Sequence, residues 1–84
     1  MLIFNQEVIY TGQEDKISKK GNPYKLVNLL DENGRQFSCM AEPDAYIPDT
    51  LNLLDKVDVT FMLKVGRYLS LSIIRMEISD AYNR

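Results

Sequence analysis

The chain has 84 residues, enough for one domain with a modest core, because a domain of this size buries only about 60–65% of its unfolded surface. Apolar residues make up 45% and charged residues 26%, a globular composition that argues against disorder or a fibrous repeat. The formal charge of −2 and the pI near 5.0 argue against a generic polyanion binder, since non-specific attraction to phosphates depends on basic charge.

Targeting signals and reactive side chains are sparse. No apolar run approaches the roughly 18 residues of a membrane span, and the first residues, MLIFNQEV, do not resemble a signal peptide. We therefore expect a cytoplasmic protein without membrane contact. Cys39 is the single cysteine and the chain has no histidine, so neither an internal disulfide nor a zinc site is expected. Cys39 is interpreted as a small apolar residue in a strand.

Charge is sorted along the chain. Residues 16–25 contain four lysines and no acid, and residues 59–76 contain three cations and no acid. Residues 42–58 hold five acids against one lysine. This segregation predicts a basic face on an otherwise acidic molecule.

The first half of the chain alternates between strand-like runs and turn signals. A strand is predicted over about residues 2–11, ending at Gly12, and residues 13–22 are interpreted as a long loop or flexible hairpin. The next strand starts at Pro23, where a missing N–H is tolerated, and runs to about Asp31. The following Asp-Glu-Asn-Gly turn predicts an antiparallel hairpin. Its second strand, residues 35–41, places alternate residues on one face: Phe37, Cys39 and Ala41.

The second half begins with a connector and ends in a hairpin. Residues 42–55 carry two prolines and four acids, and we expect one helical turn near residues 50–54. Residues 56–64 alternate clearly, with an apolar face of Val57, Val59, Phe61 and Leu63. Residues 65–67 are expected to form a turn. In the last strand, over about residues 68–78, the apolar set changes face at Ile73-Ile74, which predicts a β-bulge, and the tail from Ser79 is expected to fray.

These elements predict an all-β protein, a small five-stranded OB-like barrel with a connector between strands 3 and 4, over residues 1–84 as one domain. Catalytic patterns are missing from the sequence: it has no histidine, no glycine-rich phosphate loop and no G-x-S-x-G. The acids of residues 42–58 are spaced irregularly, as expected of a solvated surface. We expect no enzyme activity, no catalytic or metal-binding residue, no cofactor and no small-molecule substrate.

Two segments interleave aromatic residues with cations, at residues 18–25 and 64–68. Single-stranded nucleic acid needs both, because cations hold phosphates and an exposed ring stacks on a base. Tyr68 alternates with Ser70 and Ser72, so its face is expected to meet solvent or ligand. For Tyr24 the pattern leaves open which face is the core. Phe4 is expected in the core, and Phe37 in the core or at a ligand or subunit contact.

One stretch reads Ser-Lys-Lys-Gly-Asn-Pro-Tyr-Lys-Leu, at residues 18–26. A second reads Leu-Lys-Val-Gly-Arg-Tyr, at residues 63–68, and is followed by Arg75. Together they resemble the filamentous-phage single-stranded DNA-binding proteins of the gene V type. The resemblance covers about a third of the chain, and residues 29–58 depart from the family pattern. It implies an OB-like barrel, a two-fold homodimer in a bacterial host, and cooperative coating of single-stranded DNA during replication. It also implies phosphate contacts at Lys19, Lys64 and Arg75, base contacts at Tyr24 and Leu26, and stacking at Tyr68.

The full set of predicted DNA-binding residues joins the two basic segments: Lys16, Lys19, Lys20, Tyr24, Leu26, Lys64, Arg67, Tyr68 and Arg75. Two alternatives stay open at this point. One is a small β-barrel adaptor that binds a protein through a strand edge or through the acidic connector around Tyr46. The other is a module that binds single-stranded RNA, since stacking and phosphate contacts alone do not distinguish the sugars.

Overall fold

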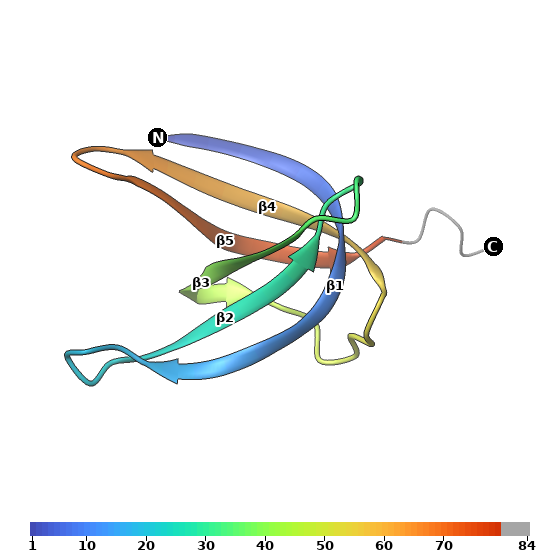
Figure 1. The fold of residues 1–84 in the computed structure, drawn as a ribbon, viewed down its shortest axis with the longest axis horizontal. Coiled ribbons are helices and arrows are strands. Elements are labelled where there is room, and N and C mark those ends of the chain that lie inside the picture. The colour runs from blue at the N-terminus through green and yellow to red at the C-terminus, as the bar shows by residue number, and fades with distance from the viewer. Residues whose placement is uncertain (80–84) are drawn as a thin grey trace.

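The computed structural model describes residues 1–79 and consists of one closed barrel (Figure 1). Its strands are β1 (Leu2–Ile17), β2 (Pro23–Leu30), β3 (Gln36–Tyr46), β4 (Lys56–Val65) and β5 (Leu69–Ile78). The order around the barrel is β1-β2-β3-β5-β4, with β3 and β5 parallel and all other neighbours antiparallel. The predicted all-β, five-stranded barrel with a connector after the third strand is confirmed. Within residues 1–79 no helix is long and apolar enough to cross a membrane.

The core is built from alternate residues of every strand, as the two-residue period of a pleated sheet requires. On β4 the predicted apolar face is inward at Val57, Val59 and Phe61, whereas Leu63 is half-buried. The complete set of buried apolar residues is Val8, Tyr10, Val27, Leu29, Cys39, Ala41, Val57, Val59, Phe61, Ile73 and Met76. Burial raises the pKa of the Cys39 thiol to about 11. Cys39 is thus the small core residue that the sequence predicts.

The first strand is longer than predicted. It does not end at Gly12 but passes through a bulge there, since Tyr10 lies opposite Leu29 and Gly12 lies opposite Asn28. Gly12 has φ +125°, a conformation that side chains strongly disfavour. Residues 13–17 then pair with β2, so the predicted polar loop is instead the arm of a hairpin closed by a tight turn over residues 18–22.

The turn between β2 and β3 confirms the prediction made from Asp-Glu-Asn-Gly. The Gly34 N–H donates to the Asp31 carbonyl at 3.0 Å, and the Asp31 carboxylate accepts from the N–H groups of Asn33 and Arg35, each at 2.8 Å. Gly34 has φ +79°, which closes a three-residue hairpin loop without strain.

The connector contains no helical turn, and it is shorter than predicted because β3 continues to Tyr46. A β-turn over residues 52–55, closed by the Asp55 N–H on the Asn52 carbonyl at 3.1 Å, takes the place of the predicted helical turn. Leu54 within this turn has φ +74°, which is incompatible with a right-handed helix. Hydrogen bonds between Tyr10 and residues 54 and 55 fasten the connector across one end of the barrel.

The bulge predicted in the last strand is confirmed. Thr60 lies opposite Arg75 and Phe61 lies opposite Ile73, so Ile74 is the extra residue. The expectation that the chain frays from Ser79 is wrong at Ser79 itself, because this residue is buried. Its N–H donates to the Lys56 carbonyl, and its hydroxyl donates to the Glu7 carboxylate. Residues 80–84, the rest of that predicted tail, lie outside the described residues.

Phe4 is the clearest exception to the predicted core. It shares the inward face with Phe61 and stacks on it with ring centroids 5.4 Å apart, yet its side chain is exposed. The reason is that β4, β5 and the start of β1 extend together past the closed part of the barrel, where no other strand of residues 1–79 covers their inner face (Figure 1). Phe37 is half-buried against the same cluster, its ring centroid 6.4 Å from that of Phe61.

Candidate nucleic-acid interface

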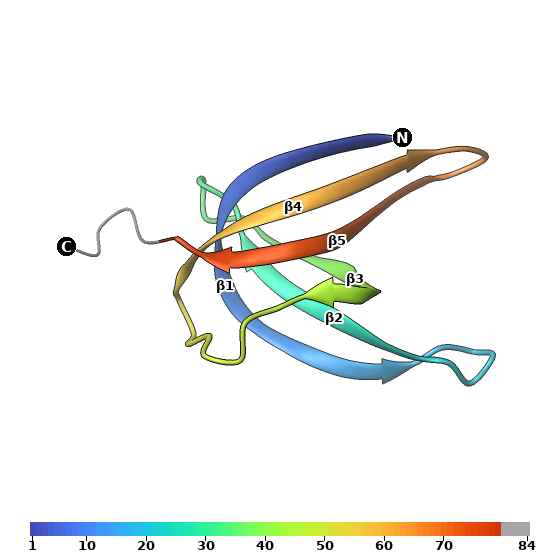
Figure 2. The same cartoon turned by 180° about the vertical axis from the view of Figure 1, so that it is seen from behind.

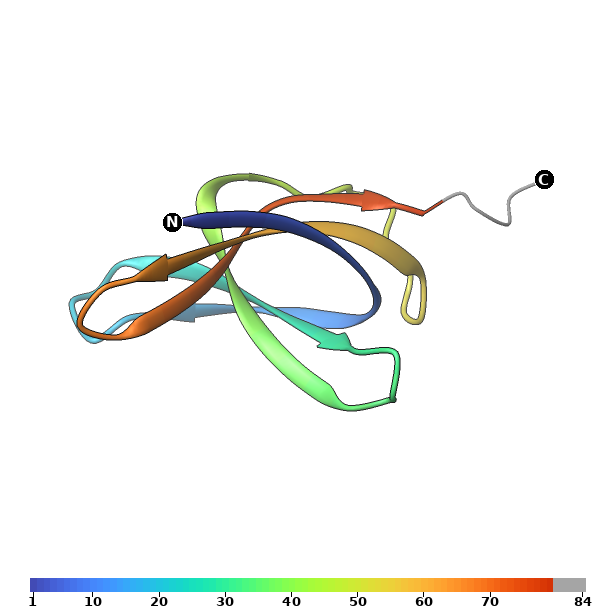
Figure 3. The same ribbon diagram turned by 90° about the horizontal axis from the view of Figure 1, so that it is seen from above.

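Two hairpins extend from the same end of the barrel (Figures 1 and 3). One joins β1 to β2 through residues 18–22, and the other joins β4 to β5 through residues 66–68. We call them the 18–22 hairpin and the 66–68 hairpin. The connector and the turn between β2 and β3 lie at the opposite end. The two hairpin turns, more than 40 residues apart in sequence, are thereby brought to one end of a molecule 44 Å long.

The cations nearest the hairpin tips are free to meet a ligand. Lys19, Lys20, Lys64 and Arg67 are exposed, and none forms an ion pair with an acid of residues 1–79. Lys16 lies 3.6 Å from the Glu14 carboxylate, measured from its Nζ atom. This pair is solvent-exposed, and exposed pairs contribute less than about 1 kcal/mol, so a phosphate can compete for the lysine.

The structure settles which way Tyr24 faces. Val27 and Leu29 point into the core, so the opposite face of β2, with Tyr24 and Leu26, points outward. Tyr24 lies opposite Lys16 on the same outer face, which places a ring beside a cation. Both predicted base-contact residues of β2 are therefore on the outside of the barrel.

Tyr68 lies in the turn of the 66–68 hairpin and is 79% exposed, so one ring face is open for stacking. The expectation that its face meets solvent is correct for Tyr68 and Ser70 but wrong for Ser72, which is only 3% exposed. Ser72 lies between two methionines on neighbouring strands, Met40 and Met62, whose longer side chains flank it.

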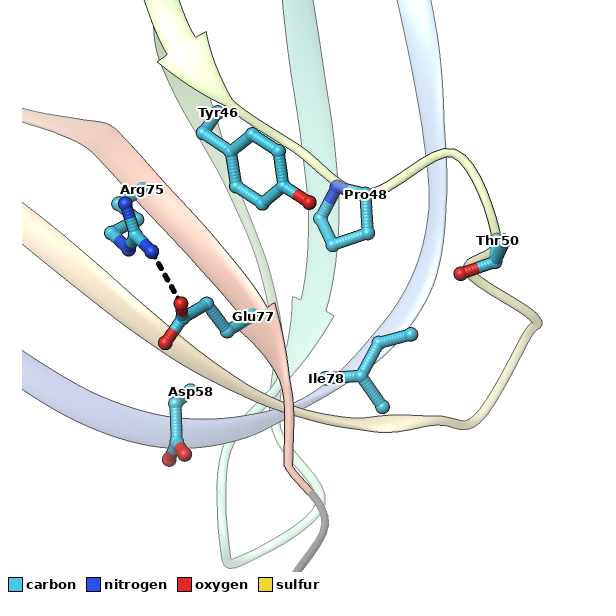
Figure 4. Close-up of a pocket in the computed structure, with 7 residues that line it drawn as sticks. All are labelled: Tyr46, Pro48, Thr50, Asp58, Arg75, Glu77 and Ile78. Atoms are coloured by element: carbon cyan, nitrogen blue, oxygen red, sulfur yellow. Dashed lines mark hydrogen bonds and ion pairs between the residues drawn. The ribbon is translucent and has the colours of Figure 1, made fainter.

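Arg75 is not part of the group at the hairpin tips. Its guanidinium forms an ion pair with Glu77 and lies 5.5 Å from the centroid of the Tyr46 ring (Figure 4). These side chains line a surface cavity of about 570 Å³ together with Asp58. Arg75 is therefore paired with one carboxylate and shares a cavity with a second, so its environment is locally acidic, not basic as the resemblance implies.

Acids also approach the space between the hairpins. β3 bends between Ala41 and Tyr46, and this bend protrudes between the two hairpins (Figure 2). It carries Glu42, which borders a cavity of about 500 Å³ together with Tyr24 and Pro43. The predicted basic face is thus basic at the two tips and mixed in charge between them.

The outer sheet face between the hairpins contains two residues that sequence reasoning did not select, Met40 and Met62. Each alternates with buried residues on its own strand, so each points outward. The two-residue period gives their direction, but their proximity depends on the pairing of β3 and β4 with β5, which is not visible in the sequence.

Among the residues that the structure describes, no three histidine, cysteine, aspartate or glutamate side chains are grouped to hold a metal ion. Comparisons of the chain with protein-family models, with curated proteins and with solved structures found no match. The arrangement of the hairpins and of the outer sheet face is therefore the basis for a functional proposal.

Proposed function

We propose that this chain is a non-catalytic single-stranded DNA-binding protein that coats DNA largely without sequence preference, in the cytoplasm of a bacterial host during phage or mobile-element replication. The observation that carries the proposal is the placement of two basic hairpins with outward tyrosines at one end of the barrel. DNA as the ligand, the replication role and the host rest on the resemblance of the two hairpin segments to the gene V type proteins.

A single strand fits this arrangement better than a duplex. A tyrosine ring stacks on a base only when the base face is accessible, and duplex bases are already stacked on each other. Tyr68 and Tyr24 lie on different hairpins, each with an exposed cation nearby: Lys16 lies opposite Tyr24, and Arg67 precedes Tyr68 in the chain. Phosphates bound by these cations leave the bases free to turn toward the rings.

The acidic composition limits how the protein binds. A chain of net charge −2 repels DNA from most of its surface, so binding depends on the cations of the hairpin end. Glu42 weakens the potential between the hairpins, and this favours moderate affinity with a clear dependence on salt.

Titration of the tyrosine fluorescence with oligo-dT tests the proposal, since stacking on a base quenches an exposed tyrosine. We expect quenching that saturates at micromolar protein in low salt, and weaker competition by duplex DNA. Absence of binding under these conditions overturns the proposal and leaves the protein-binding adaptor as the alternative. Matched DNA and RNA oligomers then decide between the sugars.

We also propose a homodimer, and an exposed apolar surface supports it. The inner faces of β4, β5 and the start of β1 carry exposed or half-buried apolar side chains beyond the closed barrel: Leu2, Phe4, Leu63, Val65, Leu69 and Leu71. We call this the apolar arm face. It contains no charged residue, and exposed apolar patches of a few hundred Å² commonly mark subunit contacts.

Replacing Leu69 by aspartate is expected to convert the dimer to a monomer, because each copy would then bury an unpaired negative charge in the interface. Light scattering at fixed concentration measures this. The matched control is Leu53→Asp on the connector, since Leu53 is 68% exposed and Leu69 is 72% exposed. A wild-type monomer, or equal dissociation by both variants, contradicts the proposed interface.

A further inference from the structure

A line of outward-facing residues crosses five strands at the base of the two hairpins. Leu26 of β2 lies opposite Met40 of β3, Met40 opposite Ser72 of β5, Ser72 opposite Met62 of β4, and Met62 opposite Ile3 of β1. We call these five residues the outer row. Strands are about 4.8 Å apart, so the part from Leu26 to Met62 spans about 14 Å, room for more than one base.

Apart from Ser72, which is polar and only 3% exposed, the outer row is apolar and accessible. Met40 is 42% exposed, Ile3 is exposed, and Leu26 and Met62 are half-buried. Ser72, at the centre, is the smallest member and adds no bulk between the two methionines. No member is charged, which separates this surface from the acidic row four residues further along β4, where Glu77 lies opposite Asp58 and Asp58 opposite Glu7.

Cations flank the outer row on the side of the hairpin tips. Tyr24 is two residues from Leu26 on β2, and it lies opposite Lys16 of β1. Lys64 is two residues from Met62 on β4. Because side chains two residues apart share a face, both lysines lie on the outer face beside the row. A polymer with regularly spaced negative charges and apolar rings matches this pattern, whereas an apolar protein segment leaves Lys64 unpaired and offers Lys16 nothing beyond its exposed pair with Glu14.

We propose that the outer row is the surface on which the bases of the bound single strand pack, with Met40 and Met62 as the main contacts. The inference rests on the proposed function and extends it to residues outside the two hairpins. A methionine side chain is flexible and polarizable, and its sulfur makes favourable contacts with aromatic rings of any identity. Base contacts of this kind are not sequence-specific, as coating a genome requires.

The test compares Met40→Ala and Met62→Ala with wild type on oligo-dT and on an abasic strand of equal length. Each variant is expected to bind oligo-dT about threefold to tenfold more weakly, the size of a sulfur–aromatic contact. On the abasic strand, which keeps every phosphate, each variant is expected to bind as well as wild type. The salt dependence of binding stays unchanged, because neither substitution removes a charge.

Leu30→Ala is the matched control, since Leu30 is also apolar, half-buried and on the outer face, but lies away from the hairpins. It is expected to leave the affinity for oligo-dT unchanged. If wild type binds oligo-dT and the methionine variants bind it equally well, or lose as much affinity on the abasic strand, the outer row is not the base-contact surface. Failure of wild type to bind either strand instead overturns the proposed function itself.

Discussion

Tyr68→Ala is expected to weaken the binding of oligo-dT about fivefold to 150-fold, because stacking on one base contributes about 1–3 kcal/mol. The free energy of unfolding is expected to change by less than about 0.5 kcal/mol, since a side chain 79% exposed loses few contacts when it is truncated. Fluorescence anisotropy of a labelled oligonucleotide measures the affinity, and urea denaturation measures the stability.

Two further tyrosine variants make this prediction specific. Tyr68→Phe keeps the ring and is expected to bind within about threefold of wild type, because stacking uses the ring face. Tyr46→Ala removes an exposed tyrosine that lies against Arg75 at the acidic cavity, and it is expected to leave binding unchanged. Equal losses for Tyr46→Ala and Tyr68→Ala contradict the placement of the site at the hairpin end.

Leu29→Ala is expected to lower the free energy of unfolding by about 2–5 kcal/mol, since it leaves a cavity in a fully buried part of the core. Leu29 lies opposite Tyr10 on one side and Phe37 on the other, so the cavity opens at the centre of the barrel. A protein this small has a stability of only about 5–15 kcal/mol, and the loss therefore shifts the midpoint of urea denaturation strongly.

The neighbouring residue provides the comparison for this stability effect. Leu30→Ala removes the same atoms from the outer face, where the side chain is half-buried, and is expected to cost less than about 1.5 kcal/mol. A loss at Leu30 as large as at Leu29 contradicts the inward face assigned to β2. DNA binding by Leu29→Ala, measured where the variant is folded, is expected to match that of wild type.

Much of the barrel follows from local chemistry. The alternation of Val57, Val59 and Phe61, the Asp-Glu-Asn-Gly turn and the change of face at Ile73-Ile74 each determine a short-range feature, and each agrees with the structure. Local patterns predict a face correctly because they depend only on neighbouring residues. They do not show whether another strand covers that face, which explains why Leu69 and Phe4 are exposed.

The missed features of the fold depend on backbone geometry. A glycine commonly ends a strand, so the continuation of β1 through a bulge at Gly12 is not visible from composition. The absence of a helical turn in the connector depends on Leu54, a residue type that rarely takes φ +74°. Hydrogen bonds from this segment to Tyr10 hold that conformation, and they are non-local.

The residues of the candidate site also divide into those that the sequence predicts and those whose surroundings depend on topology. Tyr68, Lys64 and the lysines of residues 18–22 are in hairpin turns that the sequence marks by glycine and by polar composition, and the structure places them at one end. The acidic surroundings of Arg75 depend on the parallel pairing of β3 with β5, and the outer row depends on register across strands distant in sequence. Such features follow from topology and not from local pattern.

The dependence of wild-type binding on salt tests the central claim most directly. If the hairpin cations hold phosphates, the logarithm of the affinity for oligo-dT falls linearly with the logarithm of salt concentration, with a slope of about −2 to −3.5 for three to five contacts on a single strand. The cations that contribute are Lys16, Lys19, Lys20, Lys64 and Arg67. A slope near zero, or no binding at micromolar protein in low salt, contradicts the account.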